Sequence, residues 1–68
     1  MKFKVRFRPQ NMPDYPELSM IIDINDQDIK IAGWLNDTDK ERQILEEAAK
    51  LIREKLINND IISVEKIY

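Results

Sequence analysis

Charged and hydrophobic side chains alternate without exception over residues 2–8, and this pattern limits the fold more than any other feature of the chain. In order, the residues are Lys2, Phe3, Lys4, Val5, Arg6, Phe7 and Arg8. A period of two is typical of a β-strand with one buried face and one exposed face. The pattern therefore predicts a strand over residues 2–8 whose basic side chains all lie on the face away from the core.

Hydrophobic alternation also predicts two strands over residues 18–25 and 29–34. The residues from Asp26 to Asp28 interrupt the alternation and are expected to form the turn between them. In the hairpin that results, Ile24 faces Ile29, and the hydrophobic side chains of both strands share one side of the sheet.

One amphipathic helix is predicted over about residues 38–58. Its apolar residues recur at steps of three and four and form a single stripe: Ile44, Leu45, Ala48, Leu51, Ile52 and Leu56. Thr38 followed by Glu41 fits a capping box at the start of the helix. Asn58, Asn59 and Asp60 are expected to end it in a left-handed turn.

The remaining segments complete a single domain over residues 1–68. Residues 9–17 hold all three prolines and are predicted to form a loop, and residues 61–67 are predicted to form the last strand. The fold class is therefore α+β, in the order β-β-β-α-β, with one long helix packed on one face of a small mixed four-stranded sheet. A right-handed crossover through the helix would set the last strand parallel to the first.

Several kinds of chemistry are disfavoured by the residues that the chain lacks. It contains no histidine and no cysteine, which are the commonest general base, metal ligand and nucleophile. The stretch DINDQD over residues 23–28 resembles the start of a calcium loop, but Asp28 and Trp34 occupy the positions of its glycine and closing glutamate. We therefore expect a protein that is not an enzyme, with no cofactor and no metal, and an acidic solvated turn at this stretch.

The charges are unevenly distributed along the chain. The formal net charge is -2, yet residues 1–8 carry four of the eleven basic groups and no acid. The protein therefore has an acidic body and one basic strand. With no apolar run of membrane-spanning length and no recognisable leader, a cytoplasmic location is expected. Isoleucine far outnumbers valine, which fits an AT-rich coding genome and gives a bacterial or phage source as a hypothesis.

The sheet face opposite the predicted helix is the candidate binding surface. In the predicted register it combines the basic strand with an apolar cluster on its neighbours, and Asp23 and Glu65 border the basic row. The candidate partner-binding residues are Lys4, Arg6, Arg8, Ile21, Ala32 and Trp34. A contiguous apolar patch that contains a tryptophan often marks an interface. The alternative for Trp34 is that it folds over the sheet end and belongs to the core.

Three functional hypotheses follow from this surface. The favoured one is a small protein-protein interaction module, either a regulator or inhibitor of a larger protein or a subunit of a homodimer. The second is a nucleic-acid-binding domain that uses the basic strand, although Phe3 and Phe7 point to the other face and cannot stack on bases. The third is an acidic mimic of nucleic acid, in which the acidic helix and turn occupy a basic groove on another protein.

Overall fold

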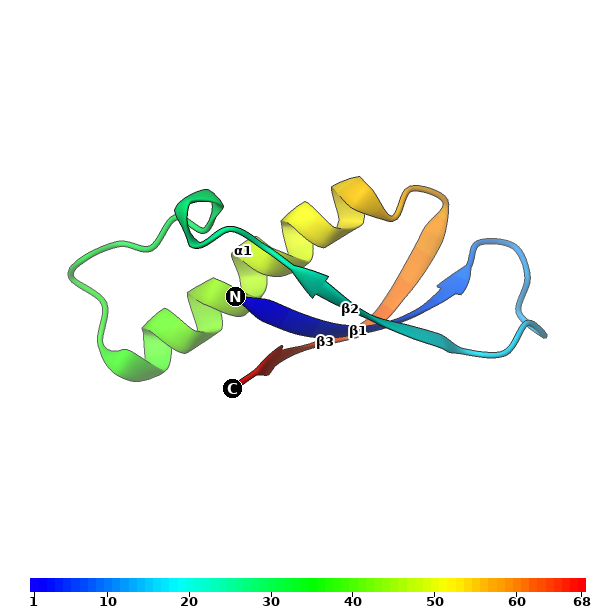
Figure 1. Cartoon of the computed structure of the whole chain (residues 1–68), viewed down its shortest axis with the longest axis horizontal. Coiled ribbons are helices and arrows are strands. Elements are labelled where there is room, and N and C mark those ends of the chain that lie inside the picture. Colours follow the sequence, from blue (N-terminus) through cyan, green and yellow to red (C-terminus); the bar gives the residue numbers. More distant parts are fainter.

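The computed structural model describes all residues, 1–68, and contains one helix packed against a three-stranded sheet (Figure 1). The elements, in chain order, are β1 (Lys2–Pro9), β2 (Leu18–Asp23), the 3-10 helix η1 (Asp26–Asp28), α1 (Asp37–Lys55) and β3 (Asn59–Ile67). The α+β class and the packing of a helix on the sheet are confirmed. The prediction of a fourth strand is wrong, because the sheet has three strands.

The basic strand β1 is the central strand of the sheet. The order is β2-β1-β3, and β1 pairs antiparallel with both neighbours. Lys4, for example, lies opposite Ile21 of β2 and Glu65 of β3. The predicted parallel pairing of the first and last strands is therefore wrong. The crossover through α1 joins β2 to β3, which are parallel to each other, and β1 lies between them.

The predicted hairpin of residues 18–25 with residues 29–34 is also wrong, because residues 29–34 form no strand. The side chain of Asn25 accepts a hydrogen bond from the Gln27 N–H at 3.1 Å and starts η1, which tightens the turn. Farther along, the N–H of Ala32 donates to the Gln43 side chain on α1 at 3.2 Å. This contact directs the segment toward the helix instead of along the sheet.

The core lies between α1 and the face of the sheet that carries Phe3 and Val5. Eight side chains are buried, from β1, β2, α1 and the segment around η1: Phe3, Val5, Ile22, Ile24, Ile29, Ile44, Ala48 and Ile52. The helix residues among them are spaced by four, as the apolar stripe predicts. Ile24 and Ile29 are both buried as expected, although they flank η1 and do not face each other in a ladder.

The two ends of α1 differ in how well the sequence predicts them. The N-cap is Asn36, whose side chain accepts the Asp39 N–H at 2.8 Å, so the capping box of Thr38 and Glu41 is wrong. Glu41 instead turns toward the end of β3. At the other end the helix stops at Lys55, before the predicted end at about residue 58. The left-handed turn after it is confirmed at Asn58, the first of its three predicted residues, which has a φ of 66°.

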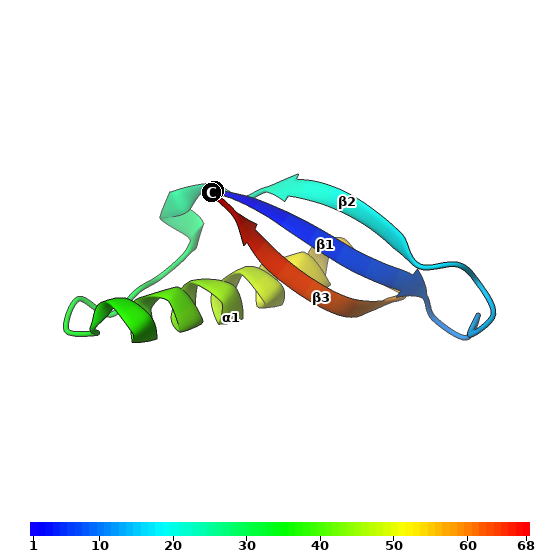
Figure 2. The same ribbon diagram turned by 90° about the horizontal axis from the view of Figure 1, so that it is seen from below.

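The molecule is elongated, because α1 and the β1–β2 hairpin are offset from each other (Figure 2). The first turns of α1 extend past one end of the sheet, and the loop after β1 extends past the other. The radius of gyration is 13.0 Å, against about 11 Å for a compact chain of this length. The accessible surface is 5053 Å², against roughly 4,500 Å² for a protein of this mass.

Neither helix has both the length and the apolar character that crossing a membrane requires.

Candidate protein interaction site

The open face is the side of the sheet that α1 does not cover. It carries three cross-strand rows, each centred on a basic residue of β1. The rows are Asp23, Lys2 and Ile67, then Ile21, Lys4 and Glu65, then Ser19, Arg6 and Ser63. This arrangement follows from the strict alternation of β1, because its odd positions fill the core and its even positions must point the other way.

Acidic side chains border the basic residues of the open face. Arg6 donates a hydrogen bond to the Glu17 carboxylate at 2.9 Å, and this contact raises the pKa of the guanidinium. Lys2 lies opposite Asp23, and Lys4 lies opposite Glu65. Opposite charges on facing positions of neighbouring strands attract each other and reduce the local potential. The open face is therefore a pattern of alternating charge and not a uniformly basic surface.

Arg8 has a different environment from the other basic residues. Its Nε donates to the backbone carbonyl of Tyr15 at 3.0 Å, which ties the proline-rich loop to β1. A register shift between Arg6 and Phe7 separates it from the three rows, and it lies opposite Asp60. Arg8 therefore lies on the same side of the sheet as the other basic residues of β1, but beyond the three rows, at the end next to the proline-rich loop.

The predicted apolar cluster of Ile21, Ala32 and Trp34 does not form, because residues 29–34 are not part of the sheet. Ile21 lies on the open face and is 62% exposed. Ala32 and Trp34 lie in the segment before α1, where they line a hollow of about 360 Å³ with Leu35 and part of the helix. Trp34 is 84% exposed, so its packing into the core is excluded. The second isoleucine of the open face is Ile67, which the alternation of the last strand places there.

A second surface feature lies along β3 and is absent from the sequence-based candidates. The β3 groove is a hollow of about 670 Å³ between α1 and β3. Its apolar walls are Leu45 and Ala49 on the helix, with Ile62 and Val64 on the strand. The one sequence signal is the pair of consecutive isoleucines at 61 and 62, which breaks the period of two and coincides with the register shift in β3.

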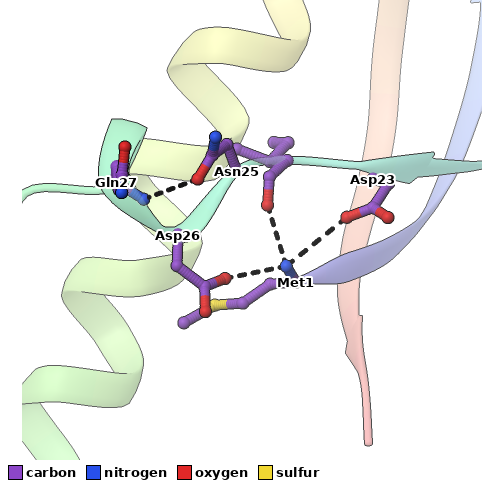
Figure 3. Close-up of polar contacts among 6 residues, drawn as sticks. Met1, Asp23, Asn25, Asp26 and Gln27 are labelled. Carbon is purple, nitrogen blue, oxygen red and sulfur yellow. Dashed lines mark hydrogen bonds and ion pairs between the residues drawn. The ribbon is translucent and has the colours of Figure 1, made fainter.

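The start of β1 is held by the acidic stretch after β2 (Figure 3). The amino group of Met1 donates to the Ile24 carbonyl and to the Asp26 carboxylate, both at 2.8 Å, and lies 3.5 Å from Asp23. The hydrogen bond to Asp26 is the main reason why the pKa of this amino group is raised. The acidic turn is thus exposed, as expected, but its carboxylates also link η1 to β1.

The end of β3 is held by a contact with α1. The Tyr68 hydroxyl donates to one oxygen of Glu41 at 2.9 Å, and Lys66 donates to the other at 3.3 Å. The bond from Tyr68 and then that from Lys66 lower the pKa of Glu41, while Glu41 raises the pKa of Tyr68. The Lys66 ammonium also lies 4.8 Å from the centre of the Tyr68 ring. These contacts fix the position of α1 beside β3 and so the width of the β3 groove.

Comparisons of this chain with protein-family models, with curated proteins and with solved structures found no match.

Proposed function

We propose that this chain is a non-enzymatic protein-binding module and that its partner binds the open face. One observation supports this more than any other: a sheet face with no second layer combines two exposed isoleucines, Ile21 and Ile67, with charges of both signs. Apolar contact surrounded by complementary polar groups is the usual composition of a protein interface. In this proposal the chain is a regulator or inhibitor of a larger partner.

The charge pattern of the open face suggests the chemistry of the partner. The basic column of Lys2, Lys4 and Arg6 runs along the centre, and acidic side chains lie in both neighbouring strands. A complementary surface would present acidic groups in a central row with apolar side chains beside them. Such alternation contributes more to the selection of a partner and to its orientation than to raw affinity.

Nucleic acid is the second candidate, and the same face supports it less well. Its support is the central position of the three basic side chains. Against it, Arg6 already pairs with Glu17, and the other two basic residues lie opposite acids. Phe3 is buried and Phe7 packs against the core on the covered side, so the open face offers no phenylalanine ring for base stacking.

A capture experiment with matched isoleucine variants tests the proposal. The full chain, Ile21→Asp and Ile57→Asp serve as immobilised bait in an extract of the cells that express the protein. Ile57 is 71% exposed but lies in the turn before β3, away from the open face, so it controls for the loss of an exposed isoleucine. We expect Ile21→Asp to retain about tenfold less partner or worse, as at a binding hot spot, and Ile57→Asp to retain the wild-type amount.

Two results would overturn the proposal. One is capture of the same amount of partner by Ile21→Asp and Ile57→Asp, whether or not it equals the wild-type amount. The other is retention of the wild type on polynucleotide at low salt, with steep salt dependence and loss in Lys4→Glu but not in Lys50→Glu. Lys50 is an exposed basic residue of α1 and provides the matched charge reversal.

A further inference from the structure

We infer that the β3 groove binds β3 of a second copy of this chain, so that two sheets join edge to edge across a two-fold axis. This surface is separate from the open face, and the inference does not depend on the function proposed above. It is carried by the free edge of β3, the apolar groove beside it, and the self-complementary sequence of the strand.

The outer edge of β3 has unpaired backbone groups. The Met1 carbonyl accepts the Ile24 N–H at 2.8 Å, so odd residues of β1 turn their backbone groups toward β2 and even residues turn theirs toward β3. On β3, Glu65 therefore pairs with β1, while Val64 and Lys66 direct their N–H and C=O groups outward. An edge strand of nine residues with no proline is a template for an added strand.

The β3 groove provides a place for the side chains of an added strand. Ile62 is 44% exposed, and Val64 is only partly covered by the core. Leu45 and Ala49 form the opposite wall on α1. In strand addition, the backbone ladder gives affinity, and a pocket beside the edge accepts alternate side chains of the incoming strand. An added strand would therefore bury the apolar surface of the groove, which a single copy leaves exposed.

The sequence of β3 selects its own copy as the occupant. In an antiparallel pair about a two-fold axis, a residue on one side of the centre meets its counterpart on the other side. When the pair is centred on Ser63, Ile62 faces Val64 of the partner subunit. Centring the pair on Glu65 would instead place two carboxylates face to face.

Ser63 would lie at the centre of this pair. Its hydroxyl oxygen is shielded from solvent and makes no hydrogen bond, and it is the only such side-chain atom in the structure. A shielded hydroxyl without a partner is costly. Because Ser63 pairs its backbone with Arg6 of β1, it would occupy a close, non-hydrogen-bonded position opposite Ser63 of the partner subunit. A second copy would reach that hydroxyl only after the side chains that shield it had moved.

The size of the molecule agrees with such a contact. Only eight residues are buried, and the accessible surface of 5053 Å² exceeds the roughly 4,500 Å² of a compact chain of this mass. Small domains without disulfides or metals commonly gain stability from a partner subunit. A standard interface takes about 800 Å² from each partner, which is a small part of the accessible surface of this chain.

Disulfide trapping tests the register directly, because the chain has no cysteine of its own. Ser63→Cys would place two thiols at the centre of the pair, within the range of Cα distances that a disulfide spans. Ser19→Cys is the matched control, since Ser19 flanks Arg6 on the opposite edge of the sheet. Under mild oxidation we expect Ser63→Cys to form covalent dimer about tenfold faster or more than Ser19→Cys.

Sedimentation of the unmodified chain completes the test. We expect wild type to be a dimer at high micromolar concentration, Ala49→Arg to be a monomer, and Glu54→Arg, an exposed helix position outside the groove, to remain a dimer. Circular dichroism checks that Ala49→Arg is folded. Ile21→Asp should leave the dimer intact, which separates this inference from the open-face proposal. A monomeric wild type, equal trapping of both cysteine variants, or a groove that binds only a different protein would overturn it.

Discussion

The two edge strands of the sheet have the same neighbour, yet their outer edges differ. β2 and β3 both pair antiparallel with β1, and each places a serine beside Arg6. β2 has six residues and only one buried side chain. β3 has nine residues, and α1 lies beside it to form an apolar groove (Figure 2). Because both edge strands pair with β1, that pairing does not distinguish their outer edges. The difference comes from α1, which forms a groove beside β3 in which a further strand can bind.

Truncation of one side chain on each edge should give the largest effect. Ile22 of β2 is buried against the core, so Ile22→Ala should lower the free energy of unfolding by about 3 kcal/mol. Val64 of β3 is partly buried, and Val64→Ala should cost roughly 1.5 kcal/mol at low protein concentration. Urea unfolding at dilute and concentrated protein measures both values.

Urea unfolding at the two protein concentrations also distinguishes a side chain of the core from a side chain of the β3 groove. The unfolding midpoint of wild type should rise with protein concentration, because association stabilises the folded state. Ile22→Ala should keep this rise, whereas Val64→Ala should weaken or lose it. If Ile22→Ala abolished the rise and Val64→Ala kept it, the assignment of the two edges would have to be reversed.

The turns that lead into the two edge strands should give an intermediate effect. Asn58 before β3 and Asn11 before β2 both have positive φ, at 66° and 62°. Asn58→Ala should cost about 1 kcal/mol, since alanine is strained in the left-handed region. Asn11 lies in a loop of exposed residues that can relax, so Asn11→Ala should cost less. Thermal unfolding of both variants, with Asn58→Gly as the strain-free control, checks this order, and an equal cost at the two sites would contradict it.

Removal of the Glu41 contact that holds β3 to α1 should have the smallest effect on the free energy of unfolding, and this effect should depend on pH. The folded-state pKa of Glu41 lies below its ordinary value of 4.5, so its carboxylate stabilises the fold above that pH. This contribution is lost as the pH falls through the lowered pKa. Unfolding free energies from pH 7 to pH 3 should therefore converge for wild type and Glu41→Gln at the acid end. Tyr68→Phe removes the main hydrogen bond to Glu41 and should lose part of the same free energy of unfolding. If the difference between wild type and Glu41→Gln grew as the pH fell, the stabilising role of the Glu41 carboxylate would be refuted.

The sequence predicts those parts of the fold that depend on local period and local turns. β1, β2, β3 and α1 all follow from hydrophobic spacing, and the turn at Asn58 follows from its residue type. Alternation shows which face a side chain occupies, but it does not show which strand lies next to it. The central position of β1 and its antiparallel pairing with β3 could therefore not be predicted from the sequence. Ile29 and Ile31 repeat with the spacing of a strand, yet tertiary contacts such as that of Ala32 with Gln43 override it.

The candidate site was predictable to a similar extent. Lys4, Arg6 and Ile21 lie together on the open face, as the alternation requires. Ala32 and Trp34 do not, because their placement depended on a strand that does not form. The β3 groove depends on how α1 lies beside β3, which is set by long-range contacts such as that of Glu41 with Tyr68. No local pattern in the chain encodes that contact.

The central position of β1 also has a consequence for the speed of folding. The hairpin with β2 closes a short loop, but the pairing of β1 with β3 joins residues near opposite ends of the chain, such as Lys2 and Ile67. Sheet contacts between residues so distant in sequence slow folding, while α1 and the hairpin can form early from local contacts. We therefore expect the docking of β3 onto β1 to be the last and slowest step of folding.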